Sequence, residues 1–219
     1  MTLYIIKLHL HRMQKSSLLG TEKISKLLYQ QAFPAAIGFM VMSINMVVDT
    51  YFVGQYIGVL AIGAISIVMP ISFLISSFGM AVGIGGASII SRALGAKDED
   101  KAQRAFNNQI TLTTVGSSLF ILLGFLFKTP ILSLFGAQGE LMEFSDIYFT
   151  LILFGMPFLS GAMMANSSLR AEGKARLPMI IMIILSISNI VMDYIFVAKL
   201  GWGMEGAAWA TTISYVFGG

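Results

Sequence analysis

The sequence predicts an all-α integral membrane protein. Of its 219 residues, 56% are hydrophobic and 11% are charged, whereas water-soluble domains carry roughly 25% charged residues. The apolar residues gather in stretches of about 20 or more, the length that a helix needs to cross a bilayer. The basic residues are scattered between these stretches and the net charge is only +3, so nucleic-acid binding has no support. Cysteine is absent, which excludes disulfides and thiol nucleophiles.

Six membrane spans are expected from the gaps between charged residues. Between Lys26 and Arg92 the only charge is Asp49, and the segment 54–58 (GQYIG) divides this region into two spans. The fifth span carries Asp193 alone. The sixth is about 21 Å long where the sequence stops, which is short of a bilayer core of about 30 Å, so we expect the chain to end within that helix. The expected spans are 28–54, 60–91, 105–127, 146–169, 177–198 and the truncated 206–219.

The positions of lysine and arginine predict how the spans are oriented, because cytoplasmic loops retain positive charge. Twelve of the fourteen basic residues fall on one side, and only Lys128 and Lys199 fall on the other. We therefore expect a multi-pass protein of the cell membrane, with residues 1–26 as a cytoplasmic extension and residues 27–219 as the membrane lobe. The extension lacks the small-residue cleavage site of a signal peptide. A short outer helix is expected around Glu140, Glu143 and Asp146.

Two carboxylates lie inside apolar spans, where an ionisable group costs roughly 2.5–3.5 kcal/mol and usually marks an ion or substrate pathway. Asp49, Asp193 and Thr211 each lie six residues from a polar residue at the outer boundary, which places all three about 9 Å below it. Asn189 lies one helical turn deeper than Asp193, and Asn45 bears the same relation to Asp49. These oxygen-bearing side chains suit a hard cation such as Na⁺. A close pair of carboxylates can also share a proton.

An interpretation without transport is that both aspartates bond to helix backbones, or that water reaches them near the membrane interface. Long side chains can reach the headgroups from within the bilayer. An aspartate side chain is too short to reach far, and this favours a functional site. No other metal site is expected.

Several segments carry a family resemblance. They are Pro34 with VVDTYFVG around Asp49, then GIGGASIISRALGAKD at 83–98, NIVMDY at 189–194 and GMEGAAWATT at 203–212. Together they cover most of the lobe in sequence order. They resemble the N-terminal half of a multidrug and toxic compound extrusion (MATE) transporter, in the paired-aspartate, DinF-like branch. The resemblance implies a twelve-helix fold of two six-helix lobes around a central cavity, of which this chain is the first.

The same resemblance implies an antiporter, not an enzyme, that exports bulky and often cationic drugs or toxic organic compounds in exchange for H⁺ or Na⁺. Its expected partners are small organic substrates, membrane lipids and the missing C-terminal lobe, with no cofactor beyond the coupling ion. Protonation around Asp49 is linked to bending of the first helix at Pro34. The family's N-lobe cation site matches Asp49, Asn189, Asp193 and Thr211. Polar positions of its network or substrate cavity match Tyr148 and Asn166.

Two other classes of function stay open. A flippase of the same superfamily would move a lipid-linked or amphiphilic molecule with a similar architecture, and drug accumulation in cells would distinguish it from an exporter. An intramembrane aspartyl protease would use the two aspartates as an acid and base pair. The glycine-x-glycine-aspartate signature of such proteases is missing around both Asp49 and Asp193, and a peptide cleavage assay would test this class.

Overall fold

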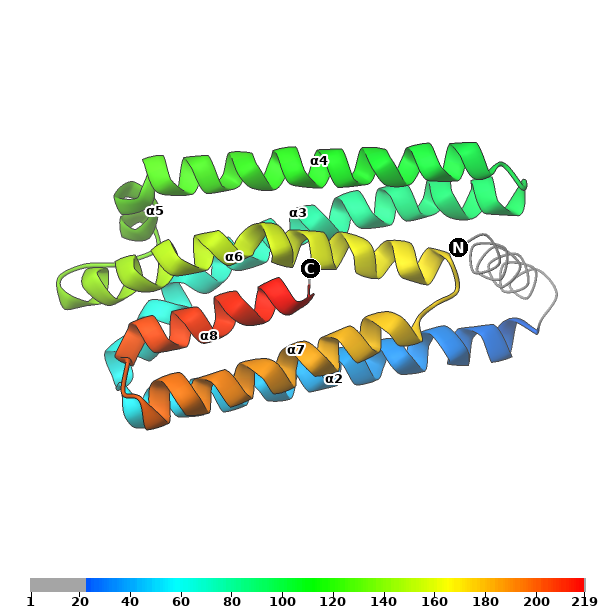
Figure 1. Cartoon of the computed structure of the whole chain (residues 1–219). Coiled ribbons are helices and arrows are strands. Elements are labelled where there is room, and N and C mark those ends of the chain that lie inside the picture. The colour runs from blue at the N-terminus through cyan, green and yellow to red at the C-terminus, as the bar shows by residue number, and fades with distance from the viewer. Residues whose placement is uncertain (1–22, 219) are drawn as a thin grey trace, which may run out of the picture.

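The computed structural model describes residues 23–218, and the regular structure of that part of the chain is helical throughout (Figure 1). This confirms the predicted all-α fold. Most of the predicted extension, residues 1–26, lies outside the described residues, and the first described helix begins within it. The helices are α2 (Ile24–Tyr56), α3 (Val59–Gly95), α4 (Glu99–Leu126), α5 (Lys128–Leu134), α6 (Glu140–Ala171), α7 (Arg176–Asp193), the π-helix η1 (Tyr194–Lys199) and α8 (Gly203–Gly218).

Five helices of the described part are long and apolar enough to cross a membrane: α2, α3, α4, α6 and the continuous segment Arg176–Lys199 formed by α7 and η1. The sixth long element, α8, has 16 residues. The long helices run back and forth, so alternate connections meet at the same end (Figure 1). We call the right-hand end in Figure 1 the basic end, because it carries Lys23, Arg92, Arg104, Arg170 and Arg176.

Local chemistry explains where several helices begin and end. Gly58 separates α2 from α3 with a φ of 123°, a conformation that favours glycine. Asp98 precedes α4, and its side chain accepts a hydrogen bond from the backbone nitrogen of Lys101 at 2.9 Å, as a helix cap does. The first turn of α6 carries Glu140 and Glu143, whose negative charge is favourable at a helix N-terminus.

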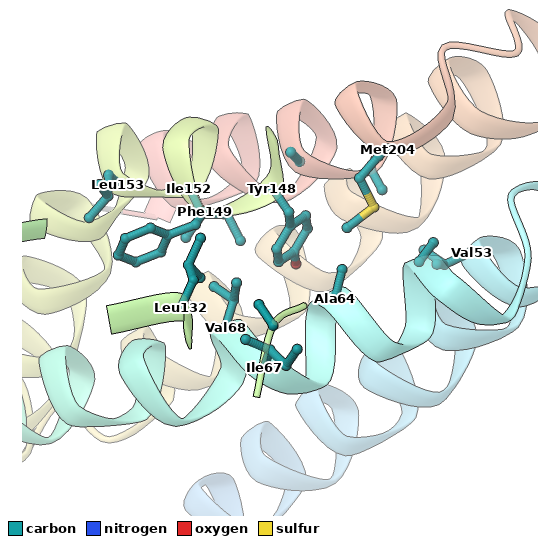
Figure 2. Close-up of a cluster of buried hydrophobic side chains, with 14 of the residues drawn as sticks. Val53, Ala64, Ile67, Val68, Leu132, Tyr148, Phe149, Ile152, Leu153 and Met204 are labelled. Atoms are coloured by element: carbon teal, nitrogen blue, oxygen red, sulfur yellow. The ribbon is translucent and has the colours of Figure 1, made fainter. Parts of the chain in front are cut away.

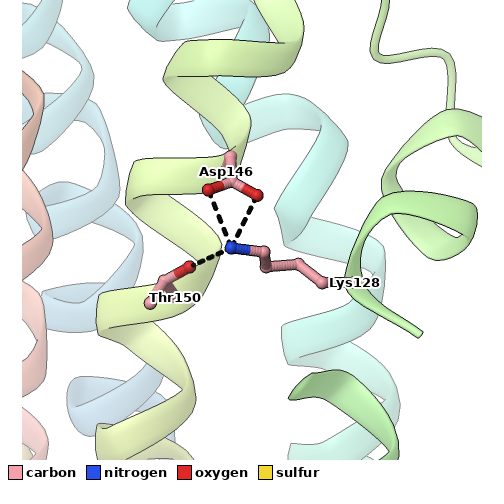
Figure 3. Close-up of polar contacts among 3 residues, drawn as sticks. All are labelled: Lys128, Asp146 and Thr150. Atoms are coloured by element: carbon pink, nitrogen blue, oxygen red, sulfur yellow. Dashed lines mark hydrogen bonds and ion pairs between the residues drawn. The ribbon is translucent and has the colours of Figure 1, made fainter. Parts of the chain in front are cut away.

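The predicted short outer helix around Glu140, Glu143 and Asp146 is therefore wrong. These residues belong to the first turns of the long helix α6, and the short helix at this end is α5. Lys128 of α5 lies 2.8 Å from each carboxylate oxygen of Asp146 and 3.2 Å from the Thr150 hydroxyl (Figure 3). This ion pair fastens α5 to the outer face of α6.

The centre of the lobe is an apolar cluster between α3 and α6, closed by residues of α5 and α8 (Figure 2). Its members include Val68, Leu132, Phe149, Ile152 and Met204, all of them buried. Small residues let the two helices approach closely. A Cβ atom added at Gly83 would lie 2.9 Å from the Cα atom of Met164 in α6. Such close contacts between backbones are typical of membrane helices.

A buried glutamine ties three helices together near the basic end. The side-chain nitrogen of Gln109 in α4 donates to the carbonyl oxygens of Val82 and Gly83 in α3, both at 3.0 Å. Its side-chain oxygen accepts a hydrogen bond from the Ser168 hydroxyl of α6 at 3.1 Å. Because all these polar groups are paired inside the bundle, they stabilise one arrangement of α3, α4 and α6.

The helices fall into two groups. One consists of α3, α4, α6 and α8, and the other of α2 and α7, which lie together along the lower edge of Figure 1. Helix α2 packs mainly on α7 and makes few contacts with α3, whereas α8 packs on both α6 and α7. The candidate site lies where these two groups meet.

Candidate cation-coupling site

Two aspartates from neighbouring helices form the centre of the site. Asp49 lies seven residues before the end of α2, about 10 Å inside the helix, and Asp193 is the last residue of α7. The side chain of Asp193 has no solvent exposure. Because α2 and α7 pack side by side, the two carboxyl groups come within hydrogen-bonding reach of each other.

The helix changes its winding at Asp193. The α-helical turns of α7 end there, and the next six residues form the π-helix η1, in which the backbone bonds run from residue i to i+5. The amide of Leu200 continues this pattern with a bond to the carbonyl of Ile195 at 2.9 Å. Single turns of this kind are often found at functional sites. The predicted span 177–198 is thus one continuous helix with two hydrogen-bonding patterns.

Helices α6 and α8 supply hydroxyl groups to the other side of the aspartate pair. The buried phenol of Tyr148 lies within hydrogen-bonding reach of the Thr211 hydroxyl and close to both aspartates. These helices approach closely at Gly155, where an added Cβ would lie 3.2 Å from the Cα of Thr212. The Thr212 hydroxyl bonds to the Leu151 carbonyl at 3.0 Å, which fixes Thr211 next to the pair.

A second polar contact joins α2 to α7 one turn away. The side-chain nitrogen of Asn45 donates to the side-chain oxygen of Asn189 at 2.9 Å. Asn189 is buried, and Asn45 is half-buried. The two asparagines therefore continue the polar seam from the carboxylates toward the basic end.

Several oxygens of this seam have no donor. The Asn45 side-chain oxygen, one oxygen of Asp49 and both oxygens of Asp193 are buried, and no donor group of the described residues reaches them. Buried polar atoms are rarely left unpaired. Carboxylate and amide oxygens are the ligands that a hard cation takes, and two adjacent carboxylates can also hold one proton between them. The residues therefore fit a bound H⁺ or Na⁺.

Two residues predicted for the substrate cavity or the hinge lie elsewhere. Asn166 is inside α6, where its side-chain nitrogen lies 3.9 Å from the Met182 sulfur of α7. It faces the seam nearer the basic end than Tyr148 does. Pro34 is buried in the first third of α2, about 22 Å along the helix from Asp49. Helix α2 continues through Pro34 without a break.

Sequence reasoning missed one residue of the site and one contact. Tyr215 lies close enough to Asp49 to interact with it electrostatically. It follows Thr211 by four residues, so the helical repeat places both on one face, and that spacing was the available signal. For Asn45, the position beside Asp49 was evident, but its bond to Asn189 depends on how α2 and α7 are rotated about their axes.

Comparisons with known proteins identify the fold and its function class. The family model MatE matches residues 34–195. The chain belongs to the MATE family. A solved structure described as the MATE multidrug transporter DinF-BH in complex with rhodamine 6G matches with a TM-score of 0.85 and 38% identity, over 90% of this chain and 44% of that one. The predicted family and the six-helix N-terminal lobe are thereby confirmed.

Curated relatives agree with this assignment. The multidrug export protein MepA of Staphylococcus haemolyticus is 30% identical over 90% of this chain and 43% of its own length. The FAD transporter of Shewanella oneidensis is 29% identical over 88% of this chain and 43% of its own length. The chain thus spans less than half of these relatives. MATE proteins are transporters, so this chain is part of a multi-pass membrane transport protein.

Proposed function

We propose that this MATE chain is the N-terminal lobe of a cation-coupled antiporter that exports organic compounds, with Asp49 and Asp193 holding the coupling ion. The observation that carries this proposal is the meeting of two carboxyl groups from α2 and α7 in a buried seam where their oxygens lack donors. A structural pair would have been supplied with donors. These oxygens are instead available to a proton or a cation.

The position of the site suggests how ion binding would be linked to movement. The aspartates belong to the α2–α7 group, whereas Tyr148 and Thr211 belong to the group of α3, α4, α6 and α8. Two bare carboxylates repel each other, and one bound cation removes that repulsion. A change of charge at the pair therefore alters how the two helix groups pack. Asn189 and Thr211 serve as neutral ligands, or they orient the carboxylates.

Helix α2 is the element best placed to respond. It has few contacts with α3, and Pro34 removes one hydrogen bond from its backbone ladder. We propose that loading of Asp49 changes the bend at Pro34. This would change the shape of the seam that Tyr148 and Asn166 line, where we place part of the substrate cavity.

Orientation and substrate class form part of the same proposal. The concentration of arginine and lysine at the basic end places that end, and the N-terminus, in the cytoplasm of a cell membrane. The relatives named above include multidrug exporters, an FAD transporter and a protein crystallised with rhodamine 6G. Bulky organic molecules are therefore the expected cargo. The second lobe is expected to complete the cavity.

An efflux assay with charge-neutral variants tests the proposal. Cells that express the complete gene are loaded with rhodamine 6G, and its loss is followed by fluorescence. Asp49→Asn and Asp193→Asn each keep the side-chain volume and remove the charge, and each is expected to abolish efflux. The matched control is Glu143→Gln, which removes an exposed carboxylate at the same end of the bundle. Efflux retained by either aspartate variant would refute the assignment.

Purified full-length protein in vesicles identifies the coupling ion. An imposed pH gradient and an imposed Na⁺ gradient are applied separately, and movement of the dye is measured for each. Movement that depends on either gradient and on Asp193 supports cation coupling. Movement that ignores both gradients contradicts it. If drug efflux is absent but a fluorescent lipid changes leaflet, the flippase of the same superfamily is the better description.

A further inference from the structure

A second feature of the lobe lies outside the aspartate seam. At the basic end, a groove of about 650 Å³ opens between α2 and α3, with the end of α6 as its third wall. This volume falls within the range of roughly 300–1,000 Å³ that is typical of small-molecule sites. Arg170 of α6 lines the groove, and Asp49 and Asp193 do not.

Among the described residues, Arg170 is the only charged side chain that lines the groove. Its guanidinium lies 5.8 Å from the centre of the Phe39 ring, so α2 positions it by a cation–π contact. Its Nε atom is buried, and no acceptor of the described residues reaches it. The nearby Glu172 carboxylate is paired with Lys174. A buried arginine nitrogen without an acceptor favours a ligand that brings an anionic oxygen.

The rest of the groove indicates the shape of that ligand. Its walls are mostly aliphatic, with Leu27, Leu28 and Ala35 from α2 and Ala87 from α3, and none of its described lining residues is aromatic. A flat aromatic compound would find no ring to stack on, whereas an alkyl chain suits such walls. Ser88 and Ser91 lie on the α3 side and offer hydroxyl donors near the charged end.

We propose that this groove binds an anionic phospholipid, with its phosphate held by Arg170 and its acyl chain lying along the aliphatic walls of α2 and α3. Arginine matches the geometry of phosphate oxygens better than lysine does. Clusters of basic residues next to membrane helices attract the anionic lipids of the cytoplasmic leaflet, and the groove lies at the basic end. The bound lipid would fill the space between α2 and the α3–α6 unit.

This inference does not depend on the proposed coupling site, because none of the residues involved belongs to it. Its consequence is a preference for anionic over zwitterionic lipid in binding, whether or not transport is measured. A soluble anionic compound would use the same arginine but not the aliphatic walls. The test therefore has to separate the head from the chain.

Native mass spectrometry of the purified full-length protein in detergent measures binding directly. Palmitoyl-oleoyl phosphatidylglycerol is titrated against phosphatidylcholine with the same acyl chains. We expect the unmodified protein to bind phosphatidylglycerol about tenfold more tightly, the equivalent of one charge-assisted contact. Arg170→Gln should abolish this preference. Arg104→Gln removes an exposed arginine at the same end but outside the groove, and it should leave the preference unchanged.

Two further variants separate head from chain and guard against misfolding. Arg170→Lys keeps the charge and should keep most of the preference, and Ala35→Phe fills the groove and should weaken binding while Arg170 is intact. Circular dichroism checks the helix content of each variant. The proposal is overturned if Arg170→Gln and Arg104→Gln bind phosphatidylglycerol equally well, or if Ala35→Phe has no effect. Competition by inorganic phosphate alone at the same concentrations as the lipid would also overturn it, because the chain would then contribute nothing.

Discussion

The side chain of Asn45 donates a hydrogen bond to that of Asn189, with 2.9 Å between nitrogen and oxygen, and so joins α2 to α7. The contact lies one helical turn from Asp49 on one helix and one turn from Asp193 on the other. It therefore sets the register in which the two carboxylates face each other.

Removal of this contact should loosen the seam. Asn45→Ala deletes the donor and leaves the Asn189 oxygen without a partner. Because side-chain hydrogen bonds between membrane helices contribute roughly 0.6 kcal/mol on average and up to about 1.7, we expect a small loss of thermal stability in detergent. A double-mutant cycle with Asn189→Ala should show a coupling energy of that size. Strictly additive effects of the two substitutions would contradict the contact.

The close packing of α3 on α6 makes a sharper prediction about stability. Gly83→Ala would place a methyl group 2.9 Å from the Met164 backbone, so we expect a loss of about 1–3 kcal/mol. Gly85→Ala is the matched control, because an added Cβ there meets nothing within 4 Å. Alanine also favours helices over glycine, so the control should be neutral or stabilising. Thermal unfolding that ranks the two variants the other way would show that α3 and α6 pack differently.

The ion pair between Lys128 and Asp146 should contribute only modestly. Both side chains are partly exposed, with 28% and 38% of their surface accessible, and such pairs contribute roughly 0.2–1 kcal/mol. Lys128→Met should therefore lower the free energy of unfolding slightly at low salt. The difference from the unmodified protein should shrink at about 1 M salt, because salt screens exposed charges. A deficit that does not respond to salt would point to lost packing of α5.

Pro34 tests the link between ion binding and helix shape. Pro34→Ala restores a backbone donor to α2 and should stiffen the helix. We expect transport by the full-length protein to fall and its dependence on the coupling cation to flatten, with helix content preserved. Pro70→Ala changes an exposed proline in α3, within the other helix group, and should leave transport intact. Equal behaviour of the two variants would remove the hinge from the mechanism.

The sequence predicted the fold and much of the site for a common reason. Helices in a membrane have a fixed rise per residue and alternate in direction, so charge gaps locate the spans and residue counts give depths. Asp49, Asp193 and Thr211 were grouped by depth alone, and the structure brings the three together with Tyr148. Depth is a one-dimensional quantity, and hydropathy carries that kind of information well.

What depends on rotation about a helix axis or on contacts between helices was not predictable in this way. The Asn45 to Asn189 bond and the three-helix contacts of Gln109 require each helix to present one particular face. The π-helical turn after Asp193 changes the register without changing the hydropathy. Glu140 and Glu143 were assigned to a separate outer helix because charge interrupts a span, although acidic residues are favourable in the first turn of a long helix.

Cysteine cross-linking tests the central claim most directly, because the chain contains no native cysteine. Asp49→Cys and Asp193→Cys are combined and treated with a short bifunctional methanethiosulfonate linker, and a cleavage site in the α6–α7 loop reports on covalent joining of α2 to α7. The control pairs Asp193→Cys with Tyr29→Cys, which lies about 30 Å from Asp49 along α2. We predict rapid, near-complete joining for the first pair and none for the control. Failure of the first pair to join, in a protein that retains its helix content, would show that the two carboxylates do not share a pocket.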